Sequence, residues 1–371
     1  MRLLSIESTP NPNSMKLNLD EALPPAASLT YRIEGKAHYS GLVQQLISIP
    51  GVESIYHCRD FMAIQRRPSA NWEVLLSEAR RILSGETASE SPLVVEASPW
   101  GEVHVSVQHF RRIPMLVKAS SGTEEGRFPL PERFGEAVQQ ATPSSPNMLL
   151  ERKWIPQKPR FGELKEVGEA VAQELDAAYD QARLDDLVKG AFDYHPEGTE
   201  ARHSLSGDER LKLLASEDWK QRYAALESMG ADPRHFAELA ALMGDPNVSI
   251  RRLATVYIGL LKTPECLPPL RGAMKDSAVA VRRSAGDALN DLGDPAAAPV
   301  MIEALQDANK LVRWRAARFL YELGGASALA ALRETEDDPE FEVRMQIRQA
   351  IDRIEGGREA QGPTWMQMTR P

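Results

Sequence analysis

Four aspartates and four arginines recur with one period in the C-terminal part of the chain, and both residue types are common in active sites. Each aspartate lies 31 residues from the next and is followed six residues later by an arginine. These residues are Asp245, Arg251, Asp276, Arg282, Asp307, Arg313, Asp338 and Arg344. An active site needs unlike groups that converge at one place. Identical groups at a fixed step instead predict a structural ladder, in which each arginine bonds the aspartate or a helix-end carbonyl of a neighbouring repeat.

The chain has two cysteines, Cys58 and Cys266, and Cys58 is the candidate reactive thiol. Cys58 stands between His57 and Arg59, which would activate its thiol if they faced it. Strand alternation places both neighbours on the opposite face, so a buried, inert thiol is the favoured interpretation. The two cysteines belong to different predicted domains, so we expect no disulfide and a reduced, cytoplasmic compartment.

A central segment, "ERKWIPQKPRFG" from Glu151, combines cations with aromatic residues. It could bind an anion or a nucleic acid, although a structural strand with a solvated face is favoured. His104 and His109 fall on opposite faces of one predicted strand, which is poor geometry for a shared metal ion. A closed pocket between this region and the repeats, lined by Glu151, Lys153 or His109, would favour an enzyme.

The periodic residues belong to repeated helical hairpins. "DPNVSIRRLATVYIGLLK" from Asp245 has three further copies that start at Asp276, Asp307 and Asp338. We expect each Asp to be a helix N-cap and Pro246 to occupy the first helical position. A weaker unit around Arg222 precedes the four copies. One hairpin cannot bury its apolar face alone, so neighbouring units must stack to form a core.

The second helix of each unit is expected to line a concave face. Helical phase leaves certain residues there least needed for the core, and Ile302 is apolar where the core does not demand it. We predict a partner-binding surface formed by Pro268, Arg271, Pro299, Ile302, Ala330 and Arg333.

The N-terminal region begins with "LLSIESTPNPNSMKLNL" from Leu3. Asn-Pro pairs favour a turn, and alternating apolar residues follow it, so a stiff connection between two strands is predicted. The motif residues are Thr9, Pro10, Asn11, Pro12, Asn13 and Lys16. Asn11 and Asn13 are interpreted first as turn-makers and second as a recognition surface.

Composition limits the class of protein. The chain has 371 residues and a formal net charge of −9, which disfavours a dedicated binder of nucleic acid or anionic membranes. No stretch reaches the roughly 20 apolar residues of a membrane helix, and the N-terminus lacks the apolar run of a signal peptide. We therefore expect neither nucleic acid nor a membrane among the partners.

Three resemblances follow from these motifs. "TPNPNSMKL", "IPGVESIY" and "DFMAI" resemble the N-terminal domain of Nfu/NifU-type iron–sulfur scaffold proteins. The 31-residue units resemble HEAT repeats of the short, phycobilisome-lyase type. "HFRRIPMLVK" and "ERKWIPQKPRFG", together with the domain order, resemble the bacterial conserved virulence factor C family.

These resemblances imply a multidomain fold. We expect an Nfu-N-like α+β domain over 1–88, a central α+β virulence-factor domain over 95–200, an all-α HEAT-like solenoid of the armadillo type over 205–356 and a flexible tail over 357–371. Nfu-type scaffolds hold their cluster with a C-x-x-C motif in another domain, and this chain has no such motif. The virulence factor C resemblance implies a link to the expression of virulence traits.

We therefore expect a non-enzymatic scaffold that takes part in protein–protein interaction, without cofactor or metal. Its expected partners are proteins, with iron–sulfur assembly proteins as one class. An accessory factor in iron–sulfur cluster assembly or delivery is the first alternative. A lyase-like enzyme is the second, and it rests on analogy with other short HEAT proteins.

Overall fold

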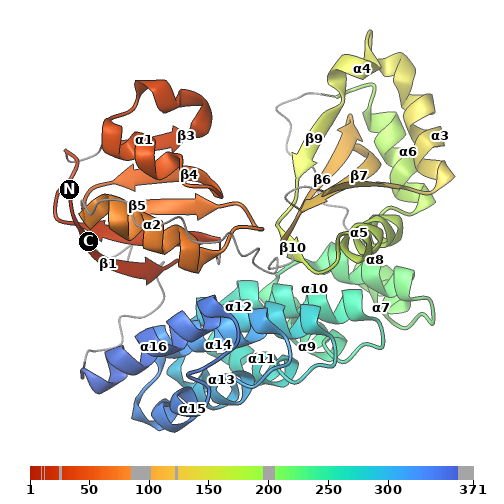
Figure 1. The fold of residues 1–371 in the computed structure, drawn as a ribbon. Coiled ribbons are helices and arrows are strands. Elements are labelled where there is room, and N and C mark those ends of the chain that lie inside the picture. Colours follow the sequence, from red (N-terminus) through yellow and green to blue (C-terminus); the bar gives the residue numbers. More distant parts are fainter. Residues whose placement is uncertain are drawn as a thin grey trace. The chain divides into compact units, whose positions relative to one another are not determined.

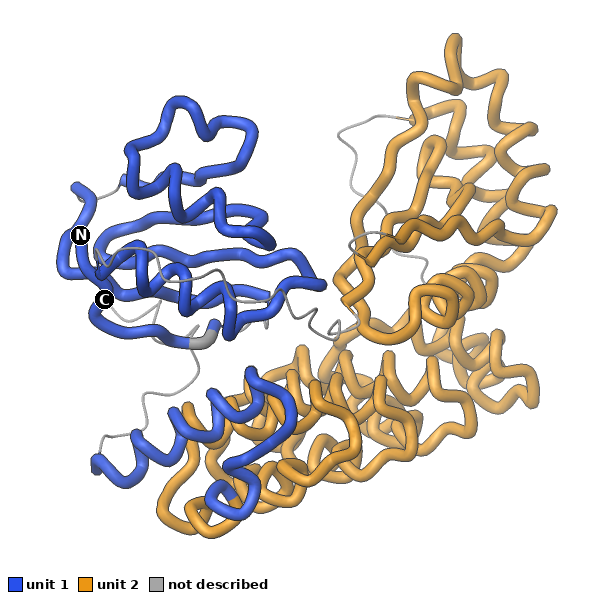
Figure 2. The backbone as a smooth tube through the Cα atoms, in the orientation of Figure 1, with its two compact units in different colours: residues 1–100, 332–359, 364–371 blue, residues 101–331, 360–363 orange. Residues whose placement is uncertain are grey.

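The computed structural model describes residues 1–9, 11, 13–24, 27–84, 102–121, 124–194 and 205–357. The chain divides into two compact units, coloured separately in Figure 2, and each unit is described by itself. Within the described residues, unit 1 combines the N-terminal part up to residue 84 with residues 332–357, and unit 2 comprises residues 102–331. The predicted tail lies outside the described residues from position 358 onward.

Unit 1 contains a five-stranded sheet of order β1-β2-β5-β4-β3 (Figure 1). Its strands are β1 (Leu3–Ser8), β2 (Ser14–Leu19), β3 (Ser28–Arg32), β4 (Val52–Cys58) and β5 (Phe61–Arg66). Met15, Leu17 and Leu19 alternate inward on β2, as the sequence predicts. Because β1 pairs antiparallel with β2, the predicted connection between two strands is confirmed.

Two α-helices pack against the core of this sheet, and a 3₁₀ helix, η1 (Ile33–His38), follows β3. α1 (Gly41–Ile47) contributes Val43, Leu46 and Ile47 to the core. α2 (Trp72–Ser84) contributes one apolar face with five buried residues. These are Trp72, Leu75, Leu76, Ala79 and Leu83.

The last helix, α16 (Phe341–Glu355), belongs to unit 1 although its sequence is the fourth repeat. Phe341 and Met345 pack against the core of the N-terminal sheet. Arg66 is fully buried and forms a 2.6 Å ion pair with Glu342. The N-terminal sheet and the last repeat helix therefore share a packed interface.

Unit 2 begins with a second sheet of order β10-β6-β7-β8, and β9 also pairs with β6. Its strands are β6 (Glu102–Phe110), β7 (Ile113–Ser121), β8 (Glu124–Pro129), β9 (Lys153–Pro156) and β10 (Arg160–Phe161). The helices of this region are α3 (Glu132–Ala141), α4 (Met148–Glu151), α5 (Leu164–Ala178) and α6 (Gln181–Gly190), with the short 3₁₀ turn η2 (Thr142–Ser144) after α3. Val167 and Val171 of α5 join the valines of β6 in one core.

The repeats of unit 2 are helical hairpins, as predicted. The helices after α6 are α7 (Gly207–Leu214), α8 (Trp219–Met229), α9 (Phe236–Leu242), α10 (Val248–Leu261), α11 (Leu267–Ala273), α12 (Val279–Leu292), α13 (Ala298–Ala304), α14 (Lys310–Leu323) and α15 (Leu329–Glu334), which crosses the unit boundary. The 3₁₀ turns η3 (Pro233–His235), η4 (Pro264–Cys266), η5 (Pro295–Ala297) and η6 (Ala326–Ala328) precede α9, α11, α13 and α15. The unit around Arg222 is therefore a further hairpin, formed by α8 and α9.

The predicted helix starts are wrong by a few residues. α10 begins at Val248 and its N-cap is Asn247, so Pro246 precedes the helix instead of occupying its first position. The Asp245 carboxylate accepts a hydrogen bond from the backbone N–H of Asn247. Asp276, Asp307 and Asp338 bond the residue two positions ahead in the same way. The aspartate thus shapes the turn before the helix, which leaves its second oxygen available to a guanidinium.

Within the part of the chain that the structure describes, none of the helices combines the length and apolar character needed to cross a bilayer.

Candidate functional site

The periodic arginines and aspartates form a ladder between successive repeats of unit 2. Arg251 Nε lies 2.7 Å from Asp276 Oδ2, and Arg282 Nε lies 2.7 Å from Asp307 Oδ2. Each second nitrogen–oxygen contact is about as short, at 3.0 and 2.9 Å, so both pairs are bidentate. Arg222 of the preceding hairpin bonds Asp245 with the same geometry.

The ladder residues are saturated with partners. Arg282 Nη1 donates to the carbonyl oxygens of Asp276 and Ser277, which precede its own helix. Burial opposes ionisation of Asp276, but hydrogen bonds from Arg251 and from the Ala278 N–H hold its pKa below the usual value. Groups tied in this way are poor proton carriers, which favours the structural interpretation over the catalytic one.

The last two ladder arginines retain the contacts within their own repeat. Arg313 donates to the carbonyl oxygens of Asp307 and Ala308 in unit 2. Arg344 donates to the Asp338 carbonyl in unit 1, and its Nη2 lies 2.7 Å from a carboxylate oxygen of Glu73 on α2. An acidic residue of the N-terminal domain thus pairs with the arginine of the final repeat.

A groove of about 690 Å³ opens in unit 2 between the central sheet region and the first helices of the hairpins. The segment from Gln157 to Gly162 and helix α5 line one side, and α8, α10 and α12 line the other. Its apolar lining includes Val248 and Leu260, which are 42% and 48% exposed. Large apolar side chains at this exposure favour contact with a ligand or another chain.

One end of the groove holds a buried charge triad. Glu174 of α5 is 5% exposed and lies between Arg160 and Arg252, each with a nitrogen 3.0 Å from Oε1. Burial alone would raise the pKa of Glu174, yet the two guanidinium groups lower it to about 2. Tyr223 is buried beside the triad, and burial together with the Glu174 charge raises the pKa of its hydroxyl. The triad ties the central region to α10.

The lining of the groove also includes a cation of a different kind. Arg283 makes no hydrogen bond or ion pair with the described residues, and its Nε is buried. Its guanidinium stacks 4.3 Å from the ring centre of Phe161. Burial lowers the pKa of Arg283 to about 10, and the nearby cations Arg315 and Arg252 add to this effect. Arg283 is therefore an unsatisfied donor at the surface of a groove.

An ion pair lies beyond Arg283. Asp287 Oδ1 lies 2.5 Å from Arg315 Nε. Asp291 sits one helical turn further on, where burial and the Asp287 charge raise the pKa of its carboxyl. The carboxylate closest in sequence to Arg283 is thus paired with another arginine.

The predicted partner-binding residues lie on a different surface. Pro268, Arg271, Pro299, Ala330 and Arg333 are exposed, and Ile302 is half-buried. None of the six lines the groove, because the groove is formed by the first helices and these residues come from the second ones. Arg333 pairs with Glu355 and Glu336 in unit 1. Partner binding at these residues stays a prediction.

Two sequence signals mark residues that line the groove, although neither signal locates the groove itself. The hairpins around Arg251 and Arg282 carry a second arginine directly after the ladder residue, and the ladder does not need it. Glu174 is seven residues after Val167 and three after Val171, so a carboxylate interrupts an apolar stripe of α5. A carboxylate on a buried stripe requires a partner, and this requirement indicates that Glu174 is paired with a cation.

The N-terminal motif forms a turn closed by its own side chains. Asn11 Oδ1 accepts a hydrogen bond from the Asn13 N–H at 2.8 Å, and the Thr9 hydroxyl lies 3.0 Å from the carbonyl oxygens of Asn11 and Ser14. Asn13 is 1% exposed and its Oδ1 accepts from Arg66 Nε. The turn-maker interpretation agrees with this geometry.

Lys16 and two prolines complete the motif. Lys16 pairs with Glu7 on the neighbouring strand at 3.2 Å. Pro10 and Pro12 lie outside the described residues. The recognition surface, and with it a role in iron–sulfur cluster assembly, stays a prediction.

The prediction that the Cys58 thiol is buried is wrong. His57 is 6% exposed and faces the core with Ile55, so Cys58 points to the other side and is half-exposed. Alternation along β4 is correct, but the inward set is the one that contains His57. Within the described residues, no group of three His, Cys, Asp or Glu side chains could hold a metal ion.

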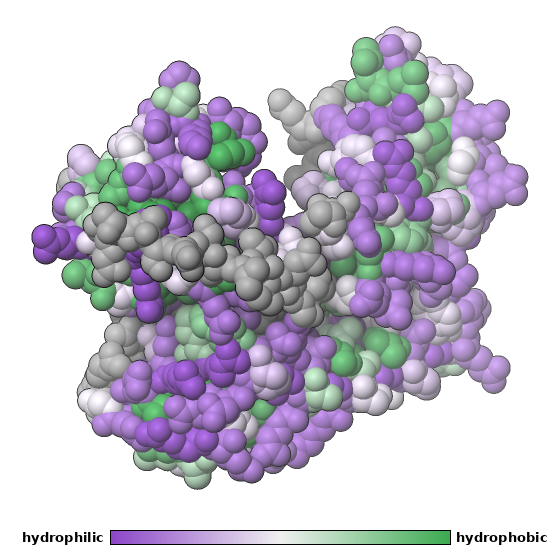
Figure 3. All heavy atoms as spheres, viewed as in Figure 1, coloured by the Kyte–Doolittle hydropathy of each residue, from purple (hydrophilic) through white to green (hydrophobic). Residues whose placement is uncertain are grey.

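The central residues considered for an enzyme do not meet at the groove. Glu151 pairs with Arg111 at 2.8 Å, and hydrogen bonds from Arg111 and Ser145 lower its pKa. Neither Glu151 nor Lys153 nor His109 lines the groove. Hydrophobic spheres gather instead over α4 (Figure 3), where Leu149 and Leu150 are 64% and 80% exposed.

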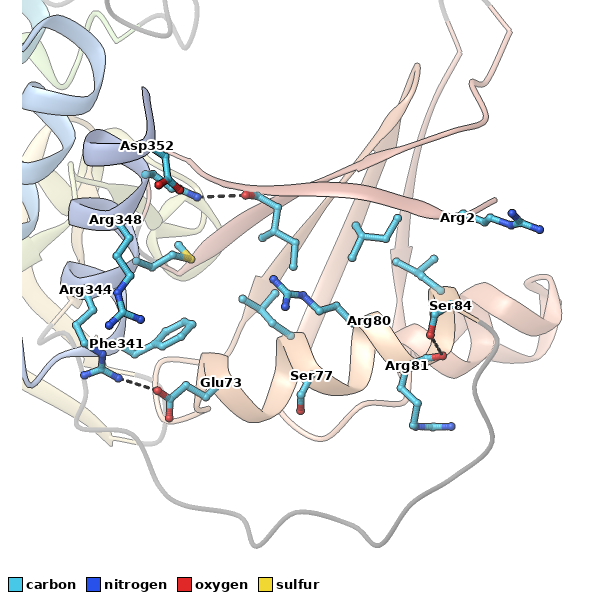
Figure 4. Close-up of a pocket in the computed structure, with 16 residues that line it drawn as sticks. Arg2, Glu73, Ser77, Arg80, Arg81, Ser84, Phe341, Arg344, Arg348 and Asp352 are labelled. Atoms are coloured by element: carbon cyan, nitrogen blue, oxygen red, sulfur yellow. Dashed lines mark hydrogen bonds and ion pairs between the residues drawn. The ribbon is translucent and has the colours of Figure 1, made fainter. Parts of the chain in front are cut away.

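A pocket of about 940 Å³ is present in unit 1 among β1, α2 and α16 (Figure 4). Leu3, Ile6, Leu76, Phe341 and Met345 supply its apolar lining. Its charged lining is mostly cationic and consists of Arg2, Arg80, Arg81, Arg344 and Arg348, with Glu73 and Asp352 as the acidic residues.

Comparisons with known proteins cover the whole chain. The chain is 50% identical to the Bacillus subtilis protein YpgR over 372 residues, covering 100% of this chain and 98% of that protein. It is 43% identical over 374 residues to conserved virulence factor C of Staphylococcus aureus, covering 100% of this chain and 99% of that protein. The chain belongs to the conserved virulence factor C family.

Family models match the three regions of this conserved virulence factor C family member separately. The model described as scaffold protein Nfu/NifU N terminal matches residues 4–90, and the model described as virulence factor matches residues 108–188. The HEAT repeats model matches residues 207–290 and 272–352. The predicted fold class and family are therefore confirmed. Among solved structures, protein SAV1430 from Staphylococcus aureus is 31% identical and covers 22% of this chain and 98% of its own, with a TM-score of 0.21.

The groove draws its residues from two of the matched regions. Arg160 and Glu174 lie within the virulence factor match, and Arg252 and Arg283 lie within the HEAT match. In this member of the conserved virulence factor C family, the groove is thus the place where the family-specific region meets a repeat array.

Proposed function

We propose that this protein is a non-enzymatic adaptor that binds a segment of a partner protein in the groove of unit 2. The observation that carries the proposal is Arg283, a half-buried arginine on the wall of the groove whose buried Nε has no hydrogen bond or ion pair among the described residues. A buried donor left unpaired is unfavourable by about 1–3 kcal/mol. A ligand that supplies the acceptor removes this penalty on binding.

The lining favours a peptide over a fully polar ligand. Leu253, Val256 and Leu260 form an apolar strip on α10, and Phe161 faces the same groove. A partner segment that carries a carboxylate for Arg283 and apolar side chains for this strip satisfies both parts. Charge-assisted bonds to Arg fix orientation, while the apolar contacts supply most of the affinity.

The charged groups of the groove support binding better than proton transfer. Glu174 is held ionised by two arginines, and Asp287 is paired with Arg315. A general base must exchange its proton near the working pH, and a carboxylate with a pKa of about 2 does not. The names of the staphylococcal relatives suggest a link to virulence traits. We propose that this link arises from the partner protein that the adaptor binds.

Affinity purification of the tagged full chain, expressed at its natural level, tests the proposal. We expect the wild type to recover a protein partner at physiological salt. The groove variant Leu260→Asp and the variant Arg283→Met should each lose that partner. Arg271→Glu on the second-helix face is the matched control, because Arg271 is exposed and does not line the groove.

Two results would contradict the adaptor. The wild type could recover no protein, or the purified chain could turn over a substrate unaided. Loss of the partner with Arg271→Glu but not with the groove variants would move the binding surface to the predicted second-helix face.

A further inference from the structure

The pocket of unit 1 goes beyond the adaptor groove, because different elements form it. It lies between α2 and α16, and β1 runs along its third side (Figure 4). Arg344 bonds Glu73 where the two helices meet, and Gln349 Nε2 donates to the Ile6 carbonyl at 3.1 Å. These bonds link the three walls to one another.

The charge of the pocket is opposite to that of the chain. The chain carries a formal net charge of −9. Five arginines and two acidic residues line the pocket. Such a local excess of one sign attracts ligands of the other sign.

Individual arginines of the pocket have different neighbours. Arg80 forms no ion pair or hydrogen bond with the described residues, and its side chain reaches into the space between α2 and β1 (Figure 4). Arg348 is half-exposed and reaches only surface carboxylates, at 3.3 Å from Asp337 and 3.6 Å from Glu336. Arg81 also lines the pocket, but its guanidinium is paired with Glu78 and is directed away from the space between α2 and β1 (Figure 4). Arg80 and Arg348 are therefore two cations of the pocket that a ligand can reach.

The floor between these cations is apolar. Leu3, Ile6 and Met345 are only partly buried, although they pack against the core of unit 1. A volume of about 940 Å³ accommodates several side chains. The lining residues of each helix extend over 12 positions, from Glu73 to Ser84 and from Phe341 to Asp352, and the first and last are about 17 Å apart along the helix.

We propose that this pocket docks an acidic, apolar-containing segment of a partner protein. Apolar side chains of the segment cover the floor, and its Asp or Glu carboxylates pair with Arg80 and Arg348. A nucleic acid fits less well, because its phosphates leave the apolar floor uncovered. A length of about 17 Å matches three turns of an amphipathic helix laid into a groove.

Photo-crosslinking in cells tests the occupant directly. Ser77 lines the pocket from α2 and is exposed, so Ser77→p-benzoylphenylalanine places the probe inside it. The same substitution at Glu53, exposed on β4 and outside the pocket, is the control position. We expect the crosslinked peptide, identified by mass spectrometry, to combine Asp or Glu with Leu, Ile or Phe.

A synthetic peptide of the crosslinked sequence then tests the charge pairing with the purified full chain. We expect Arg80→Glu to weaken binding at least 10-fold and Arg348→Glu to act in the same direction. Arg81→Glu, one residue away but directed elsewhere, should change the affinity less than 2-fold. Affinity should also fall as salt rises, because the carboxylate–arginine pairs are near the surface.

Several outcomes would overturn the inference. They are no crosslink above the Glu53 control, a crosslink to this chain's own residues 85–101 or 358–371, an adduct with lipid or nucleic acid, and equal losses for Arg80→Glu and Arg81→Glu. The groove variant Arg283→Met should leave the Ser77 crosslink unchanged, so failure of this inference is distinguishable from failure of the adaptor.

Discussion

The adjacent residues Arg282 and Arg283 lie on two differently constructed faces of one helix. Arg282 has four hydrogen bonds, two to the Asp307 carboxylate and two to carbonyl oxygens. Arg283 has none among the described residues, its Nε is buried, and its guanidinium stacks on Phe161. The same contrast, in a milder form, separates Arg251 in the ladder from Arg252 in the charge triad.

This difference in hydrogen bonding distinguishes an arginine that stabilises the fold from one whose donors are available to a ligand. A guanidinium whose donors all meet acceptors holds neighbouring repeats together. A guanidinium that is buried without acceptors destabilises the folded chain. Proteins retain such destabilising groups mainly where they serve a function. The ladder edge of the array therefore supports stability, and the groove edge is the one at which we propose that a ligand binds.

Glu174→Ala is expected to have the largest effect, because it leaves Arg160 and Arg252 buried without their shared carboxylate. Breaking a buried ion pair from one side is unfavourable by about 3–5 kcal/mol. Urea denaturation of the full chain should show this loss in the free energy of unfolding. A loss below about 1 kcal/mol would mean that solvent already reaches the triad.

Acid should act on the same triad with a definite sign. The pKa of the Glu174 carboxyl is about 2 in the folded chain, compared with 4.5 for a glutamate without these neighbours, as in the unfolded chain. Between these values the unfolded chain binds more protons, so stability falls as the pH falls from 4.5 towards 2. The wild type should lose on the order of 3 kcal/mol more over this range than Glu174→Gln. Equal slopes in denaturation measured at several pH values would contradict the assignment.

Arg282→Ala is expected to destabilise the ladder by about 2 kcal/mol, because a charge-assisted pair and two carbonyl bonds are lost together. Asp307 keeps the N–H of Asn309 as a donor, which limits the cost. A double-mutant cycle with Asp307→Ala should give a coupling energy of about 1–2 kcal/mol. Additive single effects would show that the pair does not interlock the repeats.

The repeat fold could be predicted from the sequence because its signals are local and periodic. The 31-residue step fixed the hairpins, and alternation around Met15 and Leu17 identified a strand of the N-terminal sheet. The Arg–Asp ladder could be predicted because the same two residues recur at the same position in each repeat. Helix starts were missed because the aspartate bonds the backbone two residues ahead, and a turn of this kind and an N-cap have the same sequence signature.

The position of the groove and the pairing of its charges could not be predicted, because they depend on contacts between distant parts of the chain. Glu174 and Arg252 are 78 positions apart, and nothing in either local pattern indicates the other as a partner. Glu73 and Arg344 are 271 positions apart, so the pairing of the last repeat with the N-terminal domain was equally hidden. What the sequence did show was an arginine in excess of the ladder and a carboxylate on an apolar stripe.

Arg283→Met sharpens the comparison with Arg282, because its effect on the free energy of unfolding should have the opposite sign to that of Arg282→Ala. Removing a buried, unpaired cation relieves desolvation, while the stacking on Phe161, worth about 0.5–1 kcal/mol, is partly replaced by the thioether. We expect stability to be unchanged or raised by about 1 kcal/mol, measured as the urea midpoint. Arg252→Met is the matched control and should destabilise, because it removes a partner of Glu174. Destabilisation by both variants would mean that Arg283 has a structural acceptor.

Arg271→Ala should have the smallest effect and tests the remaining surface of the array. Arg271 is exposed on the second helix α11 and belongs neither to the ladder nor to the groove. Surface changes of this kind stay within about 0.5 kcal/mol. We therefore expect an unchanged free energy of unfolding and retained partner recovery, both measured beside Arg282→Ala and Arg283→Met. If Arg271→Ala alone abolished partner recovery at unchanged stability, binding would belong to the second-helix face, and Arg283 would be a buried cation without a ligand.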